Sequence, residues 1–184
     1  GQFALLPDEF GQWRRVLAVT AADEPYGIAH LPKLLPKGDY HRCPDSTAGL
    51  HADHLLLGWG LGAYRFEHYL AKTDMPRLHS EGHSAQALAM LDASVRIRDW
   101  INLPTEDMGP EHLQTAVFDA ALAFNGKAEA IIGDDLLIHN LPTIHAVGRA
   151  SHRAPRLLRL DWGDASHPHV AICGKGVCFD SGGL

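Results

Sequence analysis

The chain has 184 residues, of which 46% are hydrophobic and 21% charged, and its formal net charge at pH 7 is −6. These values are close to those of ordinary globular proteins and argue against intrinsic disorder. The dispersed, net acidic charge gives no electrostatic footprint for nucleic acid, and no apolar run approaches the roughly 20 residues of a membrane-spanning helix.

The first half of the chain is predicted to combine short strands, turns and helices. In residues 14–20, two arginines are followed by an apolar run rich in β-branched residues, which predicts a strand. Prolines break up the next segment and leave a short helix around Ile28–Leu35. Apolar residues then recur at three- and four-residue steps from Ala52 to Leu70, which predicts a helix. The glycines of Gly58–Gly62 lie inside this apolar stripe, so we expect close helix packing and not a phosphate-binding loop.

A polar segment, Thr73–His83, is predicted to be a linker because it contains Pro76 and Gly82. A long amphipathic helix follows over Ala85–Ile101, with Ser84 as its N-cap.

The second half alternates between helices and strands, which is typical of an α/β layered domain. We predict a helix over 110–124, strands at 128–132 and 157–162 with two short helices between them, and a last strand at 169–174. The whole chain is therefore predicted to be α/β, with a small N-terminal α/β domain over 1–83, a connecting helix over 84–101 and the first part of a second α/β domain over 102–184.

Cysteines and histidines carry weak signals. Three cysteines without paired spacing fit reduced thiols, and we expect Cys173 to be a small core residue.

The N-terminus lacks the features of a secretory signal, so we expect a cytoplasmic protein. Three histidine pairs have spacings that could hold a metal, but none belongs to a recognised zinc pattern, which favours solvent-facing loop histidines; the pairs are His51 and His54, His79 and His83, and His167 and His169.

The strongest chemical signal lies at the C-terminal end. The apolar run Val170–Cys173 ends at a glycine, and Lys175 and Asp180 follow among glycines and small residues, which lets the backbone approach a ligand and both side chains converge. Taken alone, a lysine and an aspartate near a strand end are usually a surface charge pair. The full string Gly-Lys-Gly-Val-Cys-Phe-Asp-Ser-Gly-Gly, residues 174–183, resembles the signature of the leucyl aminopeptidase (M17-type) family, two-metal exopeptidases that remove N-terminal residues from peptides.

Two other segments support the resemblance. Residues 57–69 are similar to a helix of bacterial family members. Residues 98–104, Arg-Asp-Trp-Ile-Asn-Leu-Pro, are similar to the element that leads into the family's catalytic domain, although Thr105 and Glu106 depart from the expected pattern.

The resemblance implies that Lys175 is a ligand of one metal and that Asp180 bridges both ions, so that both residues lie at the substrate-binding site. Zinc or manganese are the expected ions, peptides with a free N-terminus the expected substrates, and a homohexamer the expected assembly. A lysine ligand must first lose its proton, which for a reference lysine costs roughly 4–5 kcal/mol at pH 7. Two ions about 3.5–4 Å apart can share a bridging nucleophile.

The family's other ligands and its catalytic lysine and arginine lie C-terminal to this signature, so no catalytic residue is assigned here. We therefore interpret the chain as the N-terminal portion of an aminopeptidase and expect it to be inactive by itself, with no bound metal pair. Two alternatives stay open. A phosphate-binding enzyme could use Gly174–Gly176, although the P-loop pattern is incomplete. The chain could also be a non-catalytic binding or oligomer-assembly module.

Overall fold

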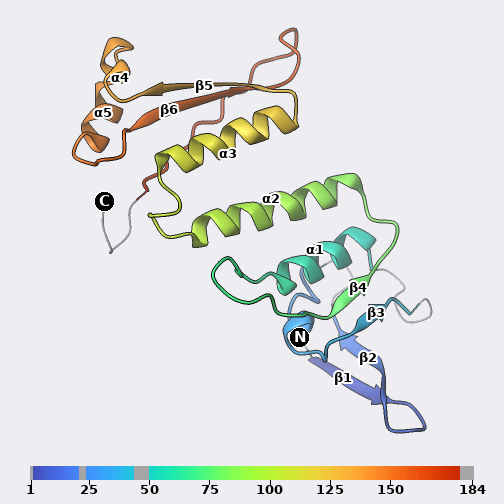
Figure 1. Cartoon of the computed structure of the whole chain (residues 1–184). Coiled ribbons are helices and arrows are strands. Elements are labelled where there is room, and N and C mark those ends of the chain that lie inside the picture. The colour runs from blue at the N-terminus through green and yellow to red at the C-terminus, as the bar shows by residue number, and fades with distance from the viewer. Residues whose placement is uncertain (1, 21–23, 44–49, 179–184) are drawn as a thin grey trace. The chain divides into compact units, whose positions relative to one another are not determined.

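The computed structural model describes residues 2–20, 24–43 and 50–178, and its helices and strands confirm the predicted α/β class (Figure 1). The chain divides into two compact units, Gly1–Asn102 and Leu103–Leu184. The domain boundaries expected from the sequence stay predictions. Asp180 lies outside the described residues.

The first unit begins with an antiparallel hairpin. Strands β1 (Gln2–Pro7) and β2 (Trp13–Val19) pair with Leu5 opposite Val16. Alternate residues face the core, as the two-residue period of a strand requires. The Asp8 carboxylate closes the hairpin by accepting the amides of Phe10 and Gln12, both at 2.9 Å. The strand predicted at 14–20 is confirmed as β2, whereas β1 was not predicted.

A second, parallel strand pair lies in the same unit. Strand β3 (Asp39–His41) pairs with β4 (Arg77–His79), which lies inside the segment predicted to be a linker. That prediction was incomplete. Strand β4 has only three residues, which is too short for an alternating apolar pattern to be recognised in the sequence. The predicted helix at 28–35 shrinks to the 3-10 turn η1 (Leu31–Lys33).

Helix α1 (Ala52–Ala63) packs on η1 and builds the core of this unit. The buried side chains of this core are Ile28, Leu31, Leu35, Leu55 and Trp59. The helix ends seven residues before the predicted Leu70, since Tyr64 takes an extended ψ of 131°. The Arg98 guanidinium donates to the Leu61 carbonyl oxygen at 2.9 Å, which satisfies one of the acceptors left free at the helix end.

Helix α2 (Ala85–Asn102) confirms the predicted long helix. Its predicted N-cap is also confirmed, because the Ser84 hydroxyl accepts the Ala87 amide at 3.1 Å. Asp53 of α1 holds this cap: its carboxylate accepts the Ser84 amide at 2.6 Å and the Ser84 hydroxyl at 2.9 Å.

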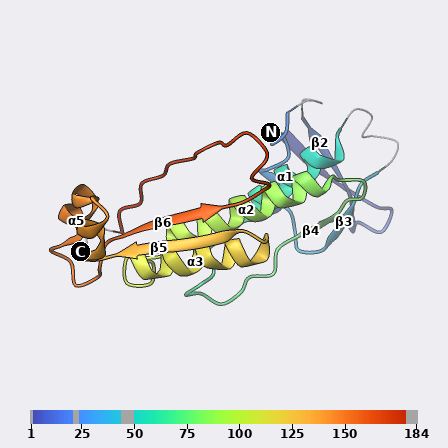
Figure 2. The same ribbon diagram turned by 90° about the horizontal axis from the view of Figure 1, so that it is seen from above.

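The second unit places helix α3 (Pro110–Ala123) against two antiparallel strands, β5 (Lys127–Ile132) and β6 (Arg156–Asp161). Short helices α4 (Asp135–Ile138) and α5 (Pro142–Gly148) lie at one end of these strands (Figure 1), and α5 can be followed there in the second view as well (Figure 2). Leu136 of α4 is fully buried. These elements confirm the helices and strands predicted from residue 110 to residue 162 within about two residues at each end.

The strand predicted at 169–174 is wrong. Residues 168–178 have no regular secondary structure, and Val170 and Ile172 are 84% and 94% exposed. Cys173 is exposed as well, so the predicted core role of Cys173 is also wrong. A strand needs a hydrogen-bonded neighbour, and no described strand pairs with this segment.

Candidate functional site

Lys175 lies in the exposed C-terminal segment of the second unit. Its side chain makes no hydrogen bond or ion pair with any residue that the structure describes. A Cβ added at the neighbouring Gly174 would meet no atom within 4 Å. The amine of Lys175 is therefore not committed to a carboxylate in the described structure. Its predicted partner ligand, Asp180, lies outside the described residues, so the predicted convergence of the two side chains stays a prediction.

Just beyond Lys175, the chain passes close to one side chain of helix α3. A Cβ added at Gly176 would lie 3.4 Å from the Leu113 Cδ1 atom, an ordinary packing distance. Cys178, two residues further, is partly buried, whereas residues 161–177 are all exposed. Cys178 is therefore the first residue after β6 that is partly buried, and further back in the segment the Trp162 indole donates to the Phe124 carbonyl oxygen at 2.9 Å.

Three charged groups act on the partly buried Cys178 thiol: Glu111 in the first turn of α3, Arg153 before β6, and Arg156 at the start of β6. Burial raises the pKa of the thiol above the ordinary value, and the Glu111 carboxylate raises the pKa further, while Arg153 and Arg156 act in the opposite direction. The thiol is therefore protonated at neutral pH, which argues against a nucleophilic cysteine here. Ion pairs with Glu111 link the two arginines, and we call the three residues the arginine cluster: Glu111, Arg153 and Arg156.

Arg153 connects the arginine cluster to the segment before α3. Its guanidinium donates to the carbonyl oxygens of Thr105 and Glu106 and lies 3.5 Å from both the Glu106 and the Glu111 carboxylates. Its side chain is only 12% exposed, so the carboxylates and carbonyls replace the water that a guanidinium otherwise binds.

Arg156 completes the arginine cluster. It donates to the Gln114 side-chain oxygen at 2.6 Å and to the Ala154 carbonyl oxygen, and it lies 3.9 Å from Glu111. Gly109, which precedes α3, leaves room for this arrangement. A Cβ at Gly109 would lie 2.3 Å from the Arg153 Nη1 atom and 2.8 Å from the Glu111 Oε1 atom.

The arginine cluster was missed by the sequence analysis. Its members join residues more than forty positions apart, and no periodicity or motif connects such positions. The one available signal is the pair of arginines in Arg153-Ala-Pro-Arg156, directly before a predicted strand.

His51 and His54 lie next to each other, with ring centroids 5.6 Å apart, but no third ligand joins them among the described residues. His79 pairs with Asp39 at 2.9 Å and stacks on His41, with ring centroids 4.7 Å apart, while His51 caps helix α1. Among the described residues, no group of three or more potential metal-binding side chains is placed to hold an ion. The prediction that these histidines lie in solvent-facing loops is confirmed only in part, since His54 lies inside α1 and His79 inside β4.

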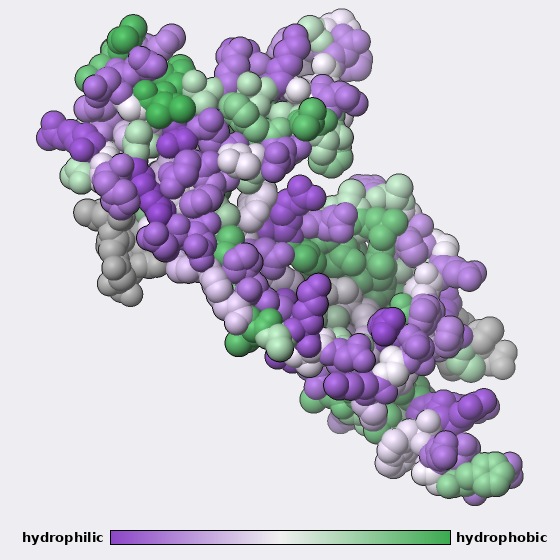
Figure 3. Space-filling view, viewed as in Figure 1, coloured by the Kyte–Doolittle hydropathy of each residue, from purple (hydrophilic) through white to green (hydrophobic). Residues whose placement is uncertain are grey.

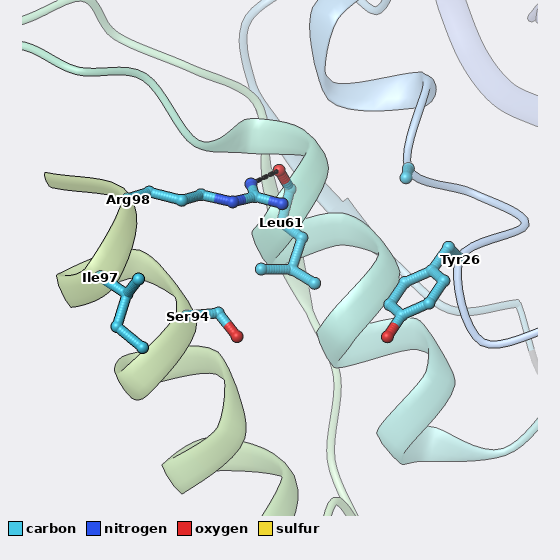
Figure 4. Close-up of a pocket in the computed structure, with 6 residues that line it drawn as sticks. Tyr26, Leu61, Ser94, Ile97 and Arg98 are labelled. Atoms are coloured by element: carbon cyan, nitrogen blue, oxygen red, sulfur yellow. Dashed lines mark hydrogen bonds between the residues drawn. The ribbon is translucent and has the colours of Figure 1, made fainter. Parts of the chain in front are cut away.

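An open groove of about 560 Å³ lies in the first unit between α1, α2 and the segment before η1 (Figure 4). Its walls are mostly apolar, and its one cation, Arg98, is already bonded to the Leu61 carbonyl oxygen. The residues lining it are Tyr26, Ala29, Leu61, Ser94, Ile97 and Arg98. None of them belongs to the predicted metal site. No helix in the described part of the chain is long and apolar enough to cross a membrane.

Comparison with family models gives two matches. Residues 1–79 match the model described as the M17 aminopeptidase N-terminal domain, and residues 95–184 match the catalytic domain of the cytosol aminopeptidase family. The second match includes the arginine cluster, Lys175 and Asp180.

Individual relatives agree with these matches. Peptidase B of Cronobacter sakazakii and Peptidase B of Pectobacterium carotovorum are each 45% identical to this chain, over 94 and 96 residues, which is 47% of this chain and 22% of each relative. The crystal structure of a cytosol aminopeptidase from Coxiella burnetii is 36% identical, with a TM-score of 0.86 over 98% of this chain and 40% of that one. A bottromycin maturation enzyme, BotP, in complex with Mn shares the fold, with 20% identity and a TM-score of 0.66 over 89% of this chain and 40% of that one. The matched region thus spans about a fifth of the curated relatives and two fifths of the similar solved structures.

Proposed function

Because this chain belongs to the M17 cytosol aminopeptidase family, we propose that it forms part of a metal-dependent aminopeptidase that hydrolyses the N-terminal peptide bond of peptides. The observation that supports this most directly is the catalytic-domain match across residues 95–184, which contains the Lys175 and Asp180 signature. The proposed protein carries this chain together with the further ligands of a two-metal site, and the 184-residue chain alone is inactive.

Lys175 and Asp180 are the proposed metal ligands. The donor set fits a divalent cation, since the Lys175 amine is exposed and uncommitted among the described residues and a carboxylate can bridge two ions. An amine holds a metal ion only through its nitrogen lone pair, so Lys175 would be the nitrogen ligand of the pair and Asp180 the oxygen ligand. When bound, the ions supply Lewis acidity and an activated water.

Zinc or manganese are the proposed ions, because nitrogen and oxygen ligands accept either. BotP, which shares the fold, has a structure in complex with Mn. We further propose peptides with a free N-terminus as substrates, a homohexameric assembly and a cytoplasmic location, which are the properties that the family resemblance implies.

The test measures hydrolysis of a leucine chromogenic amide by the longer protein, with added zinc or manganese. Lys175→Ala and Asp180→Ala are each expected to lose well over a hundredfold in kcat/KM and to lose a bound ion, since changes outside the ligand shell already cost about 10–100-fold. Lys127→Ala, which removes an exposed lysine from β5 of the same unit, is the matched control and should retain wild-type activity.

The opposite result would be a folded, metal-loaded protein that cleaves no aminoacyl amide. In that case the proposal fails, and a non-catalytic binding or assembly module becomes the better account of the chain.

A further inference from the structure

A second cavity of the first unit is lined by three cationic side chains. Its volume is about 540 Å³, which is within the usual range of small-molecule sites. Among its described lining residues, Lys33, Lys37 and Arg65 are cationic and Asp74 is the one carboxylate, in a chain whose net charge is −6. We propose that this cavity, which we call the lysine pocket, binds the phosphate group of a small molecule. The inference uses residues of the first unit alone and does not depend on the proposed function.

The two lysines are placed by a repeated tripeptide. The sequence Leu-Pro-Lys occurs at residues 31–33 and again at residues 35–37. In both copies the leucine is buried in the core of the unit, with Leu31 at 5% and Leu35 at 8% exposure. A proline with a fixed φ stands between each buried leucine and its lysine. The backbone of both lysines is therefore held in place before any ligand arrives, which lowers the entropy lost on binding.

Hydrogen bonds fix the same stretch of chain. The amides of Leu34 and Leu35 both donate to the Leu31 carbonyl oxygen at 2.9 Å. The Tyr40 hydroxyl, at the start of β3, donates to the Pro36 carbonyl oxygen at 2.8 Å. Backbone contacts thus hold both copies of the tripeptide and leave the lysine ammonium groups out of the network.

The three cations are available to a ligand. Lys33 and Lys37 are exposed and make no hydrogen bond or ion pair with any residue in the described part of the chain. The Arg65 side chain is 45% exposed, and its Nε atom lies 4.0 Å from Glu67 Oε1, a long distance for an ion pair. The same Glu67 oxygen accepts the Thr73 amide at 2.9 Å, which ties the chain after Arg65 to the next wall of the pocket. Most of the five guanidinium donors of Arg65 therefore have no described partner.

The wall that precedes β4 combines apolar surface with one carboxylate. The Trp59 indole donates to the Pro76 carbonyl oxygen at 3.2 Å, which fixes this wall to helix α1. Asp74 lies 3.8 Å from the Arg77 Nη2 atom, so part of its charge is already balanced. Met75 and Pro76 add apolar surface to the lining, so a ligand can combine an anionic group with an apolar body.

Charge and geometry favour a phosphate over a carboxylate. Three cations and one carboxylate give the lining a formal charge of +2. A phosphate monoester carries a charge of about −1.5 to −2 at pH 7 and three strong acceptor oxygens, whereas a carboxylate carries a single charge. Lysine acts as a point charge toward phosphate, and arginine can donate two parallel hydrogen bonds to it. The lysine pocket can therefore balance the full charge of one phosphate group.

An amide NMR titration of the 184-residue chain with phenyl phosphate, at constant ionic strength, tests the proposal. The amide peaks of residues 33–37 and 73–75 should move together and give one Kd. Lys33→Gln, Lys37→Gln and Arg65→Gln should each raise this Kd about five- to tenfold, the loss that fits a partly exposed hydrogen bond between charged groups. Since all three side chains are exposed, the peaks of the second unit should stay in place and report an intact fold.

Two charge-matched variants serve as controls. Lys72→Gln removes an exposed cation next to Thr73 that is not among the described lining residues. Arg96→Gln removes an exposed cation from α2 of the same unit. Both variants should leave the Kd for phenyl phosphate within twofold of wild type.

Two further ligands identify the chemistry that the pocket selects. Benzoate keeps the ring but carries one charge, so it should bind at least about tenfold more weakly than phenyl phosphate. Inorganic phosphate keeps the charge and lacks the ring. Weaker binding of inorganic phosphate would identify a phosphate ester as the ligand class, and equal binding would identify free phosphate.

Three results would overturn the inference. If Lys72→Gln weakens binding as much as Lys33→Gln, binding follows the net charge and not the pocket. If benzoate binds as tightly as phenyl phosphate, the cations do not select a phosphate group. If millimolar phenyl phosphate and inorganic phosphate leave the peaks of residues 33–37 and 73–75 unmoved, the lysine pocket is ordinary solvated surface.

Discussion

Asp53 is the residue that joins the starts of helices α1 and α2. Its carboxylate accepts both the amide and the hydroxyl of Ser84, and the Ser84 amide is the main cause that lowers the Asp53 pKa below 3.8. A carboxyl whose pKa is lower in the folded state stabilises the fold fully above the unfolded pKa, and this stabilisation is lost as the pH falls through the folded value. We therefore expect Asp53→Ala to lower the Tm of the first unit by a few degrees at pH 7, and this difference to shrink below about pH 4.

Thermal unfolding followed by circular dichroism between pH 3 and pH 7 measures this difference. Asp92→Ala, which removes an exposed carboxylate from the middle of α2, is the control and should show no such pH-dependent gap. A gap between wild type and Asp53→Ala that is constant down to pH 3 would contradict the assigned role of the carboxylate.

At the scale of single residues, the sequence predicted hydrogen bonds between near neighbours correctly, but it did not predict which side chains are buried. Ser84 was predicted as an N-cap and is one, because a cap depends on residues only three positions apart. Cys173 was predicted in the core and is exposed, because its burial requires a sheet neighbour that a local pattern cannot supply. Arg153 was not predicted at all, since its partners at 105, 106 and 111 are remote in the sequence.

At the scale of elements, the glycines of α1 explain how closely this helix approaches its neighbours. A Cβ at Gly62 would lie 1.9 Å from the Ala29 carbonyl oxygen, and one at Gly60 would lie 2.5 Å from the tip of the Leu91 side chain on α2. The close packing predicted from the Gly58–Gly62 pattern is thus confirmed. Replacing glycine by alanine inside a helix ordinarily gains about 1 kcal/mol, but here the collision reverses the sign.

The two collisions differ in what must move, and this gives a graded prediction. Gly62→Ala meets backbone atoms, so we expect a net loss of about 1–3 kcal/mol in the free energy of unfolding. Gly60→Ala meets only the end of a flexible leucine, so its loss should be smaller, and Leu91→Ala in the same chain should relieve it. Urea denaturation of the three variants measures the order; equal losses for both glycine variants would contradict it.

The elements predicted correctly from the sequence are those that carry their own apolar periodicity or a residue that marks where a helix begins. Helices α2 and α3 have a 3.6-residue apolar pattern with a cap or a first-turn proline. The run Val170–Cys173 has the composition of a buried strand, but strand formation depends on pairing, and the described structure offers it no partner. The same dependence on a remote partner hid β4 inside an apparent linker.

At the scale of the whole molecule, the two units differ in how much apolar surface they bury. The first unit has a cluster of five buried residues, whereas in the second unit the described buried hydrophobic residues are only Ala121 and Leu136. Apolar side chains lie exposed on α4 and α5 of the second unit, where Ile138 and Val147 are 80% and 74% exposed (Figure 3). Since burial of apolar area is the main stabilising contribution, the second unit should be the less stable one.

We therefore expect the 184-residue chain to unfold in two steps, with residues 103–184 opening first. Hydrogen exchange read by mass spectrometry along a urea series separates the units by peptide. Leu136→Ala should lower the first step by about 2–5 kcal/mol and leave the second unchanged, and Leu55→Ala should do the reverse. A single transition in which peptides from both units exchange together, shifted equally by either substitution, would mean that the two units share their stability and that the difference in buried area does not set the order of unfolding.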